Sequence, residues 1–327
     1  MTSQVNVLGI GNAIVDVLAR VDDAFLAEIG AEKRTMTLID ELRAIDVYEM
    51  MGPGVEMSGG SVANTIAGLA SLGGSTAFIG RVADDQLGSI FNHDLQSLGV
   101  DVRLPPFVGG AATARSHILI TPDGQRTMQT YLGACAELAV EDVNDGTVGD
   151  PEVILLEGYA WDIPQGPALL LEATKVAERK GAVVALSLSD ALCVARHRRA
   201  FFDVAERHAG MVFGNESEMI NLFDAETFDE AVARASTLGT LFVMTRTEKG
   251  CVVVEGDEVI VQEAYPVSEV IDATGAGDAH TAAFLYQLAS GGSLKECAVF
   301  ASRCATAVIS QVGGRLDVHA LDHLPDP

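Results

Sequence analysis

Residues 271–279 read Ile-Asp-Ala-Thr-Gly-Ala-Gly-Asp-Ala and place an acidic residue, Asp278, inside a run of small residues. The run leads into the apolar stretch 282–288, so the pattern predicts a helix that begins near the glycines. Backbone N–H groups at a helix start attract anions. The amides that could form such an anion hole are those of Gly275, Ala276, Gly277 and Asp278.

Asp278 itself has two interpretations. Aspartate is a common N-terminal helix cap. It could instead be a general base that takes the proton of a hydroxyl while the neighbouring amides hold a transferring phosphoryl group. The loop is not a Walker A loop, because no lysine in the chain is followed by serine or threonine. The residues alone leave the cap and the base open.

A second loop of small residues, 58–64, reads Ser-Gly-Gly-Ser-Val-Ala-Asn and precedes another predicted helix. Gly59 and Gly60 allow a ligand to approach the backbone closely. Asn64 falls in the first turn of that helix and offers both a donor and an acceptor, as recognition of a sugar hydroxyl requires. The alternative is a tight strand-to-helix turn with a solvated asparagine.

Near the N-terminus, residues 9–16 read Gly-Ile-Gly-Asn-Ala-Ile-Val-Asp. They fail as a dinucleotide-binding fingerprint, because Ile14 occupies the third glycine position and a strand, not a helix, is expected to follow. Asp16 lies in that alternating strand, where its carboxylate could accept two hydrogen bonds from a vicinal diol. An ordinary exposed strand aspartate is the competing interpretation.

Two further polar segments follow predicted strands. Asn215 and Glu218 are three residues apart and share a face of a first helical turn, where an amide and a carboxylate suit a hydrated Mg²⁺. This spacing is common by chance. Residues 245–250, Thr-Arg-Thr-Glu-Lys-Gly, form a strand–loop–strand rim that could equally be a plain polar turn.

Short apolar runs alternate with amphipathic stretches, which is typical of a parallel sheet with crossover helices. The predicted strands are 5–10, 75–79, 153–156, 183–188, 211–213 and 241–245, and the predicted helices are 62–72, 86–98, 167–180, 228–238, 279–289 and 294–310. The alternating segments 14–21, 112–121 and 125–132 break this pattern and predict a small antiparallel sheet. We therefore expect one α/β domain over 1–327, with lid segments at about 12–38 and 105–133.

The chain has 327 residues and a formal net charge of −25, from 21 Lys+Arg against 46 Asp+Glu. So acidic a surface repels phosphate backbones and anionic lipids, which disfavours nucleic-acid and membrane partners. The five cysteines form no C-x-x-C pair, and from the lack of a basic segment near the start and of a long apolar run we expect no secretory leader and no membrane span. These features predict a soluble protein of a reducing cytoplasm.

Together these motifs resemble the ribokinase-like (PfkB) family of carbohydrate and nucleoside kinases over residues 6–314. Its two signatures correspond to residues 58–73 and 272–278, and residues 80–88 match a further familiar stretch. The resemblance implies a three-layer α/β/α body with a β lid. It also implies phosphorylation of a primary hydroxyl by Mg-ATP. Ala273 and His280 depart from the family, which usually has a threonine and an aromatic residue there.

The resemblance also assigns roles to individual residues. Asp278 would be the base, and Asn215 and Glu218 would hold the hydrated Mg²⁺. Asp272 would belong to a loop for a monovalent cation such as K⁺, and we expect Arg126 to reach the phosphates. The sugar would be held by Asn12, Asp16, Gly59, Gly60, Ser61 and Asn64. The nucleotide site would include Asn215, Thr245, Glu248, Gly250, Gly275 and Gly277.

Segments 9–16, 58–64 and 121–128 look more like the adenosine-kinase branch than ribokinase or fructokinase. The leading expectation is therefore transfer to the 5′-hydroxyl of adenosine, by a monomer or a homodimer. Apolar walls for the base could come from Leu38, Phe107, Leu132 and Trp161. The alternatives are a kinase of ribose, fructose or a related sugar, and a non-catalytic ligand-binding member of the fold.

Overall fold

A computed structural model describes residues 6–267, 269–311 and 313–323. Its main sheet has nine strands in the order β14-β13-β12-β11-β10-β9-β1-β5-β6, and all pairs are parallel except at one edge, where β13 runs antiparallel to both β12 and β14. The strands are β1 Asn6–Ile10, β5 Ser75–Ile79, β6 Asp101–Val102, β9 Val153–Glu157, β10 Val183–Ser187, β11 Ala209–Asn215, β12 Leu241–Thr245, β13 Cys251–Glu255 and β14 Glu258–Gln262. The central strands are nearly continuous apolar runs, as expected of strands that are covered on both faces.

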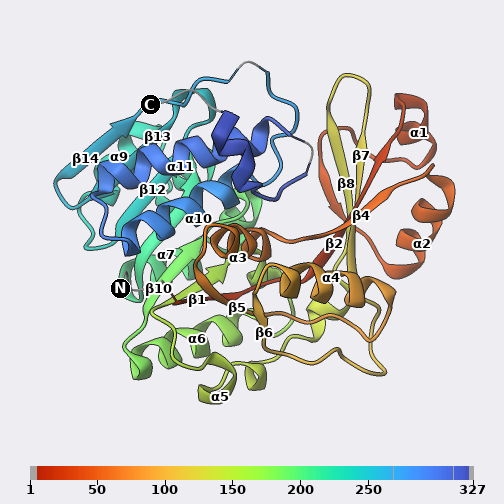
Figure 1. Cartoon of the computed structure of the whole chain (residues 1–327), viewed down its shortest axis with the longest axis horizontal. Helices are drawn as coiled ribbons and strands as arrows, with labels where there is room; N and C mark the ends of the chain where they lie inside the picture. The colour runs from red at the N-terminus through yellow and green to blue at the C-terminus, as the bar shows by residue number, and fades with distance from the viewer. Residues whose placement is uncertain (1–5, 268, 312, 324–327) are drawn as a thin grey trace.

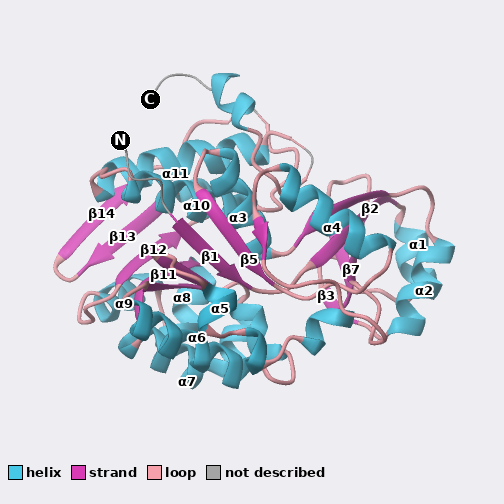
Figure 2. Cartoon of the chain, turned by 60° about the horizontal axis from the view of Figure 1, so that its bottom comes forward, coloured by secondary structure: helices cyan, strands magenta, loops and turns pink. Residues whose placement is uncertain are grey.

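Helices cover both faces of this sheet (Figure 2). The face bearing α3, α4, α10 and α11 encloses one hydrophobic cluster, and the face bearing α6, α7, α8 and α9 encloses the other. The bounds are α3 Ser61–Ser71, α4 Gln86–Ser97, α5 Asp145–Val148, α6 Gly166–Lys180, α7 Ala191–Arg207, α8 Glu216–Phe223, α9 Phe228–Ala235, α10 Ala276–Ala289 and α11 Leu294–Ile309. Short 3₁₀ helices occupy Gly133–Glu137, Val140–Asp142, Gly158–Asp162, Thr247–Lys249 and Val318–His323. The expected three-layer α/β/α architecture is confirmed.

A second sheet of five strands stands beside the main body (Figure 1). Its order is β3-β8-β7-β2-β4, and α1 and α2 lie on its outer side. The elements are β2 Ile14–Arg20, α1 Asp23–Glu28, β3 Met36–Leu38, α2 Glu41–Met50, β4 Val55–Gly59, β7 Ala114–Ile120 and β8 Arg126–Tyr131. The hairpin β7–β8 is antiparallel as expected, whereas β2 pairs with β7 in parallel. The sheet also includes β4, which lies outside the two segments expected to form it.

The predicted strands and helices are present apart from shifts at their ends, but eight elements were not predicted: α1, α2, α5, α7, β3, β4, β6 and β14. Residue 5 of the first predicted strand lies outside the described residues. The longest of these eight elements, α7, begins after its N-cap Asp190 and turns a mostly polar surface outward. Non-helical backbone at His197 interrupts its apolar period, which explains the omission. Across the described residues, every helix is too short or too polar to cross a lipid bilayer.

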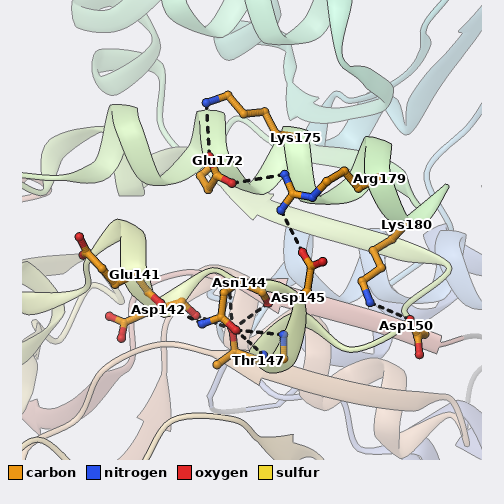
Figure 3. Close-up of polar contacts among 11 residues, drawn as sticks. Glu141, Asp142, Asn144, Asp145, Thr147, Asp150, Glu172, Lys175, Arg179 and Lys180 are labelled. Atoms are coloured by element: carbon orange, nitrogen blue, oxygen red, sulfur yellow. Dashed lines mark hydrogen bonds and ion pairs between the residues drawn. The ribbon is translucent and has the colours of Figure 1, made fainter.

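Exposed ion pairs link α6 to the segment around α5, on the side of the sheet away from α10 and α11 (Figures 2 and 3). Arg179 pairs with Asp145 at 2.9 Å and Lys180 with Asp150 at 3.0 Å. Such solvated pairs add about 0–1 kcal/mol each. They therefore do little to fix the fold, which rests on the two apolar clusters.

Candidate active site

A cavity of about 360 Å³ lies between the main sheet and the second sheet. Parallel strands bring their carboxyl ends to one edge, and ligands of open α/β sheets bind there. Glu157, Ser187 and Thr245 close three of these strands and line the cavity. The predicted site residues that also line it are Asn12, Asp16, Gly60, Ser61, Asn64, Asn215, Glu218, Gly275, Ala276, Gly277 and Asp278.

Asp278 lies in the first turn of α10 and faces the start of α3. Ser61 donates its hydroxyl to Oδ1 of Asp278 at 2.7 Å, and Asn64 donates Nδ2 to Oδ2 at 3.2 Å. Burial raises the pKa of Asp278 to about 6, and these two hydrogen bonds limit the rise. N-terminal capping is not its role, since the N-cap of α10 is Gly275 and no side chain caps it. The carboxylate is instead held in the cavity, where it is mostly ionised at neutral pH.

The helix start beside Asp278 presents free donors. Among the described residues, the backbone N–H groups of Gly277 and Asp278 have no acceptor, whereas Ala276 N–H donates to the carbonyl of Ala273 at 3.4 Å. Gly275 makes the turn possible with a φ of 72°, and a Cβ there would lie 2.1 Å from the carbonyl oxygen of Gly314. This arrangement can bind an anion at the N-terminus of α10.

The loop before α3 lies against the end of β1. Gly60, the N-cap of α3, has a φ of 94°, and a Cβ there would lie 2.4 Å from the carbonyl oxygen of Asn12. Asn12 is 1% exposed, lines the cavity and has a buried Oδ1 without a partner among the described residues. An unpartnered buried acceptor is costly, so it fits a ligand hydroxyl.

Asp16 projects from β2 next to Gly59, which does not itself line the cavity: a Cβ at Gly59 would lie 2.3 Å from Oδ2 of Asp16. Its carboxylate accepts no hydrogen bond from the described residues, although it lines the cavity. Burial raises the pKa of Asp16 to about 7. The two oxygens are therefore available to hydroxyl donors of a ligand.

Asn215 and Glu218 form a capping box at the start of α8. Asn215 donates Nδ2 to Oε1 of Glu218 at 2.6 Å and its backbone N–H to Oε2 at 2.9 Å. Burial raises the pKa of Glu218 to about 7, and no cation among its described neighbours opposes that rise. A buried carboxylate of this kind fits a nearby Mg²⁺. Because the oxygens already serve the cap, they suit contact through the metal's waters.

Thr245 alone of the rim residues 245–250 lines the cavity. Glu248 is exposed and accepts from the Thr247 hydroxyl at 2.6 Å. Gly250 has a φ of 82°, and a Cβ there would lie 1.9 Å from the carbonyl oxygen of Gln262. Nucleotide contacts of Glu248 and Gly250 stay predictions.

Arg126 and Asp272 lie next to the anion-binding loop but do not line the cavity. The Arg126 guanidinium pairs with the Asp272 carboxylate and contacts the Thr274 hydroxyl. Asp272 also accepts from the N–H groups of Thr274 at 2.7 Å and Gly313 at 2.9 Å. The charge of Asp272 is thus already matched by a guanidinium, which does not fit a K⁺ ion on this carboxylate.

The second sheet supplies an apolar wall to the cavity. Of the four apolar residues expected there, Leu38 and Leu132 line it. The expectation is wrong for Phe107, which lies under the Arg81 guanidinium at 4.9 Å, and for Trp161, which stacks on Phe201 in the core with centroids 4.3 Å apart. Residues that complete the wall are Ile14, Met36, Ile118 and Met128.

Sequence reasoning missed two charged residues of the site. Glu157, at the end of β9, is 1% exposed and accepts from the Val62 N–H at 3.0 Å, and burial raises its pKa to about 7. Arg315 follows two glycines near the C-terminus and binds Asn64 and Ser58. In the sequence, Glu157 is marked only by an acidic residue at the end of an apolar strand, and Arg315 only by the two glycines before it. Both patterns are too short to predict a site residue alone.

His280, where the chain departs from the family's usual aromatic residue, lines the cavity as a neutral side chain because burial lowers its pKa to about 4.

Comparison with known proteins agrees with this geometry. The family model described as pfkB family carbohydrate kinase matches residues 52–321. A solved structure titled adenosine kinase from Sinorhizobium meliloti is 45% identical, with a TM-score of 0.91 over 98% of both chains. A probable sugar kinase from Rhizobium etli is 41% identical, also with a TM-score of 0.91, over 99% of this chain and 98% of that one. Among curated proteins, a ribokinase of Arabidopsis thaliana is 27% identical over 286 residues, 84% of this chain and 71% of that protein.

The fold, the anion-binding helix start and the family match define a phosphotransferase that acts on an alcohol group. The chain belongs to the PfkB family of carbohydrate and nucleoside kinases.

Proposed function

We propose that this protein transfers the γ-phosphoryl group of Mg-ATP to the 5′-hydroxyl of adenosine. The observation that carries the proposal is the position of Asp278, a carboxylate held by Ser61 and Asn64 beside the unpaired N–H groups that begin α10. A base and an anion site next to each other are the two parts that phosphoryl transfer to an alcohol needs.

In the proposed reaction, Asp278 takes the proton of the acceptor hydroxyl. The acceptor oxygen forms a bond to the γ-phosphorus, and the bond from that phosphorus to the β,γ-bridging oxygen breaks to release ADP. The N–H groups of Gly277 and Asp278 stabilise the charge on the transferring group. With a pKa of about 6, Asp278 is largely ionised at neutral pH yet basic enough to accept a proton.

The charges around the cavity explain why a divalent cation is needed. Carboxylates line it at Asp16, Glu157, Asp162, Glu218 and Asp278, and no lysine or arginine among the described residues does. Triphosphate would be repelled unless its charge were offset. We infer that Asn215 and Glu218 hold the waters of a Mg²⁺ ion, which would neutralise phosphate charge. A contact of Arg126 with the phosphates stays a prediction, because its charge is paired with Asp272.

The lining of the cavity supports a nucleoside acceptor. Asp16 and Asn12 offer acceptors for the hydroxyls of a ribose. The second sheet, which carries Asp16, also presents apolar residues to the cavity, among them Leu38, Ile118 and Met128, and a purine base would cover them, whereas a free sugar would leave them exposed to water. The 45% identity to an adenosine kinase supports the same acceptor. We further propose that the second sheet is a lid that excludes water during transfer.

An ADP-release assay with Mg-ATP and a panel of adenosine, inosine, guanosine, ribose and fructose tests the proposal. We expect the highest kcat/KM with adenosine and a product phosphorylated at the 5′ position. Asp278→Asn, purified identically, controls for a contaminating kinase. Activity confined to free sugars would instead support the sugar-kinase function suggested by the Rhizobium etli relative, and inactivity on the whole panel would contradict a kinase of these acceptors.

A further inference from the structure

Arg315 lies behind the catalytic loop, in a C-terminal segment that packs on the anion-binding turn. Gly314 approaches Gly275 so closely that no side chain fits between them, and the Gly313 N–H donates to Asp272. Arg315 itself is partly buried and does not line the cavity. The segment therefore brings a cation close to the site without exposing it to the ligand.

The guanidinium of Arg315 makes two hydrogen bonds into the first signature loop. Nε donates to Oδ1 of Asn64 at 3.0 Å, and a terminal nitrogen donates to the Ser58 hydroxyl at 2.8 Å. Ser58 in turn donates its hydroxyl to Asp94 at 2.7 Å. Two separate donors on one planar group thus fix the guanidinium in the plane that serves Asn64.

The contact with Asn64 decides how its amide is turned. A guanidinium has donors and no acceptor, so it must face the amide oxygen. The amide nitrogen then faces Asp278, where it donates to Oδ2 at 3.2 Å. With the amide reversed, Asn64 would present its oxygen to a carboxylate and its nitrogen to a cation, and both contacts would be repulsive.

Arg315 also acts on the charge of the site. Three carboxylates face Asp278 from the surrounding elements, together with Tyr159 and the neutral His280, and Arg315 is the cation among the described residues that lowers the pKa of both Asp278 and Asp16. Its own pKa is lowered by burial to about 10, so it stays protonated at neutral pH. The facing carboxylates are those of Asp16, Glu157 and Glu218, whereas Asp94 acts on Arg315.

We propose that Arg315 is a positioning residue for phosphoryl transfer, which orients the Asn64 amide toward Asp278 and keeps the Asp278 carboxylate ionised. This inference rests on the proposed kinase function, because its effect on rate is exerted through Asp278. The proposal has two parts that can be tested separately. The positive charge near Asp278 can also be supplied by a lysine. The pair of planar donors that contacts Asn64 and Ser58 cannot be reproduced by a lysine.

The test compares Arg315→Met and Arg315→Lys by the pH dependence of kcat/KM for the acceptor. In the parent protein we expect kcat/KM to rise with pH around pH 6, as Asp278 loses its proton, and then to reach a plateau. Removing the charge in Arg315→Met is expected to move this rise, the acidic limb, upward by about one pH unit and to lower the plateau value of kcat/KM by about tenfold or more. Arg315→Lys is expected to keep the limb within a few tenths of a unit while its plateau falls. Arg81→Met, which removes a partly buried arginine paired with Asp142 outside the cavity, controls for general destabilisation.

A parent-like profile in Arg315→Met would overturn the proposal, and so would an equal shift of the limb in the methionine and lysine variants. A second readout does not need activity: the loss of Tm in Arg315→Met is expected to be greater at pH 8 than at pH 5, because the facing carboxylates are then ionised. A pH-independent loss would also overturn the proposal. If the parent protein were inactive on every acceptor, the proposed function would fail while this second readout still tested Arg315.

Discussion

The hydroxyl of Ser61 donates to Oδ1 of Asp278 at 2.7 Å, although the two residues lie 217 positions apart in the chain. This contact joins the two family signatures, since Ser61 begins α3 and Asp278 lies in the first turn of α10. The two helices pack on the same face of the main sheet, so the Asp278 carboxylate is fixed between two rigid elements. The predictions below follow from that arrangement.

Replacing Ser61 with alanine removes a hydrogen bond to the ionised form of Asp278. Hydrogen bonds to charged groups contribute about 1.5–3 kcal/mol, so we expect kcat to fall by roughly ten- to a hundredfold. The pKa of Asp278 rises, because that bond holds it down, and the acidic limb of the pH–rate profile moves to higher pH. Ser71→Ala, at the other end of α3, is the control and should leave both quantities unchanged. A profile of the Ser61 variant that matches the parent would contradict the role assigned to this hydroxyl.

Asp16 gives a prediction about stability and pH. Burial raises its pKa from 3.8 to about 7, so between these pH values the folded state binds its proton more tightly than the unfolded state. This carboxyl group therefore costs increasing stability as pH rises from 4 through 7. Asp16→Asn should raise the free energy of unfolding little at pH 4 and by on the order of 1–3 kcal/mol at pH 8, which thermal unfolding at the two pH values measures as a larger rise in Tm at pH 8. Asp46→Asn, an exposed change on α2, should show no such trend, and an equal gain at both pH values would refute the assignment.

Much of the site could be predicted from sequence because its loops are local. The runs of small residues at 58–64 and 271–278 indicate tight backbone turns from the local sequence alone, and residues of both runs line the cavity. The partners of these loops could not be predicted in the same way. Arg315 reaches Asn64 across 251 positions, and only the packing of the C-terminal segment on Gly275 brings it there.

The apolar residues predicted to line the cavity also could not be identified from local sequence. Leu38 and Trp161 are both large and apolar, yet Leu38 lines the cavity at 49% exposure whereas Trp161 is 5% exposed in the core. Nothing local distinguishes them, because the difference depends on which face of which sheet each residue occupies. Strand β4 was missed for a related reason, since its first residues are exposed and give no alternating pattern.

The role of Glu218 can be tested through the metal. Glu218→Gln keeps a side-chain oxygen for the cap of α8 but removes the charge, so we expect the Mg²⁺ concentration for half-maximal activity to rise about tenfold or more. Glu296→Gln makes the same change in the exposed capping box of α11 and should leave the Mg²⁺ requirement unaltered. Measuring ADP release against free Mg²⁺ checks both variants, and an unchanged requirement in Glu218→Gln would remove this residue from the metal site.

Gly275 can be tested by adding a single methyl group. Gly275→Ala is destabilised by two effects: the φ of 72° is unfavourable for alanine, and its Cβ would lie 2.1 Å from the Gly314 carbonyl oxygen. Gly291→Ala, at the other end of α10, meets only the first, because its φ is 84° and its surroundings are open. The unfavourable φ costs about 1–3 kcal/mol in each. We expect Gly275→Ala to lose more stability in thermal unfolding and to lose activity, whereas equal effects of the two variants would contradict a close packing of the C-terminal segment on the anion-binding turn.

The central claim is that Asp278 accepts the proton of the acceptor hydroxyl. Its most direct measurement is the turnover of Asp278→Asn with saturating Mg-ATP and adenosine, beside its affinity for a non-hydrolysable ATP analogue measured by calorimetry. We predict a loss of about 10²-fold or more in kcat, the usual contribution of a positioned base, with the affinity for the analogue nearly unchanged. Turnover close to that of the parent protein would contradict the account.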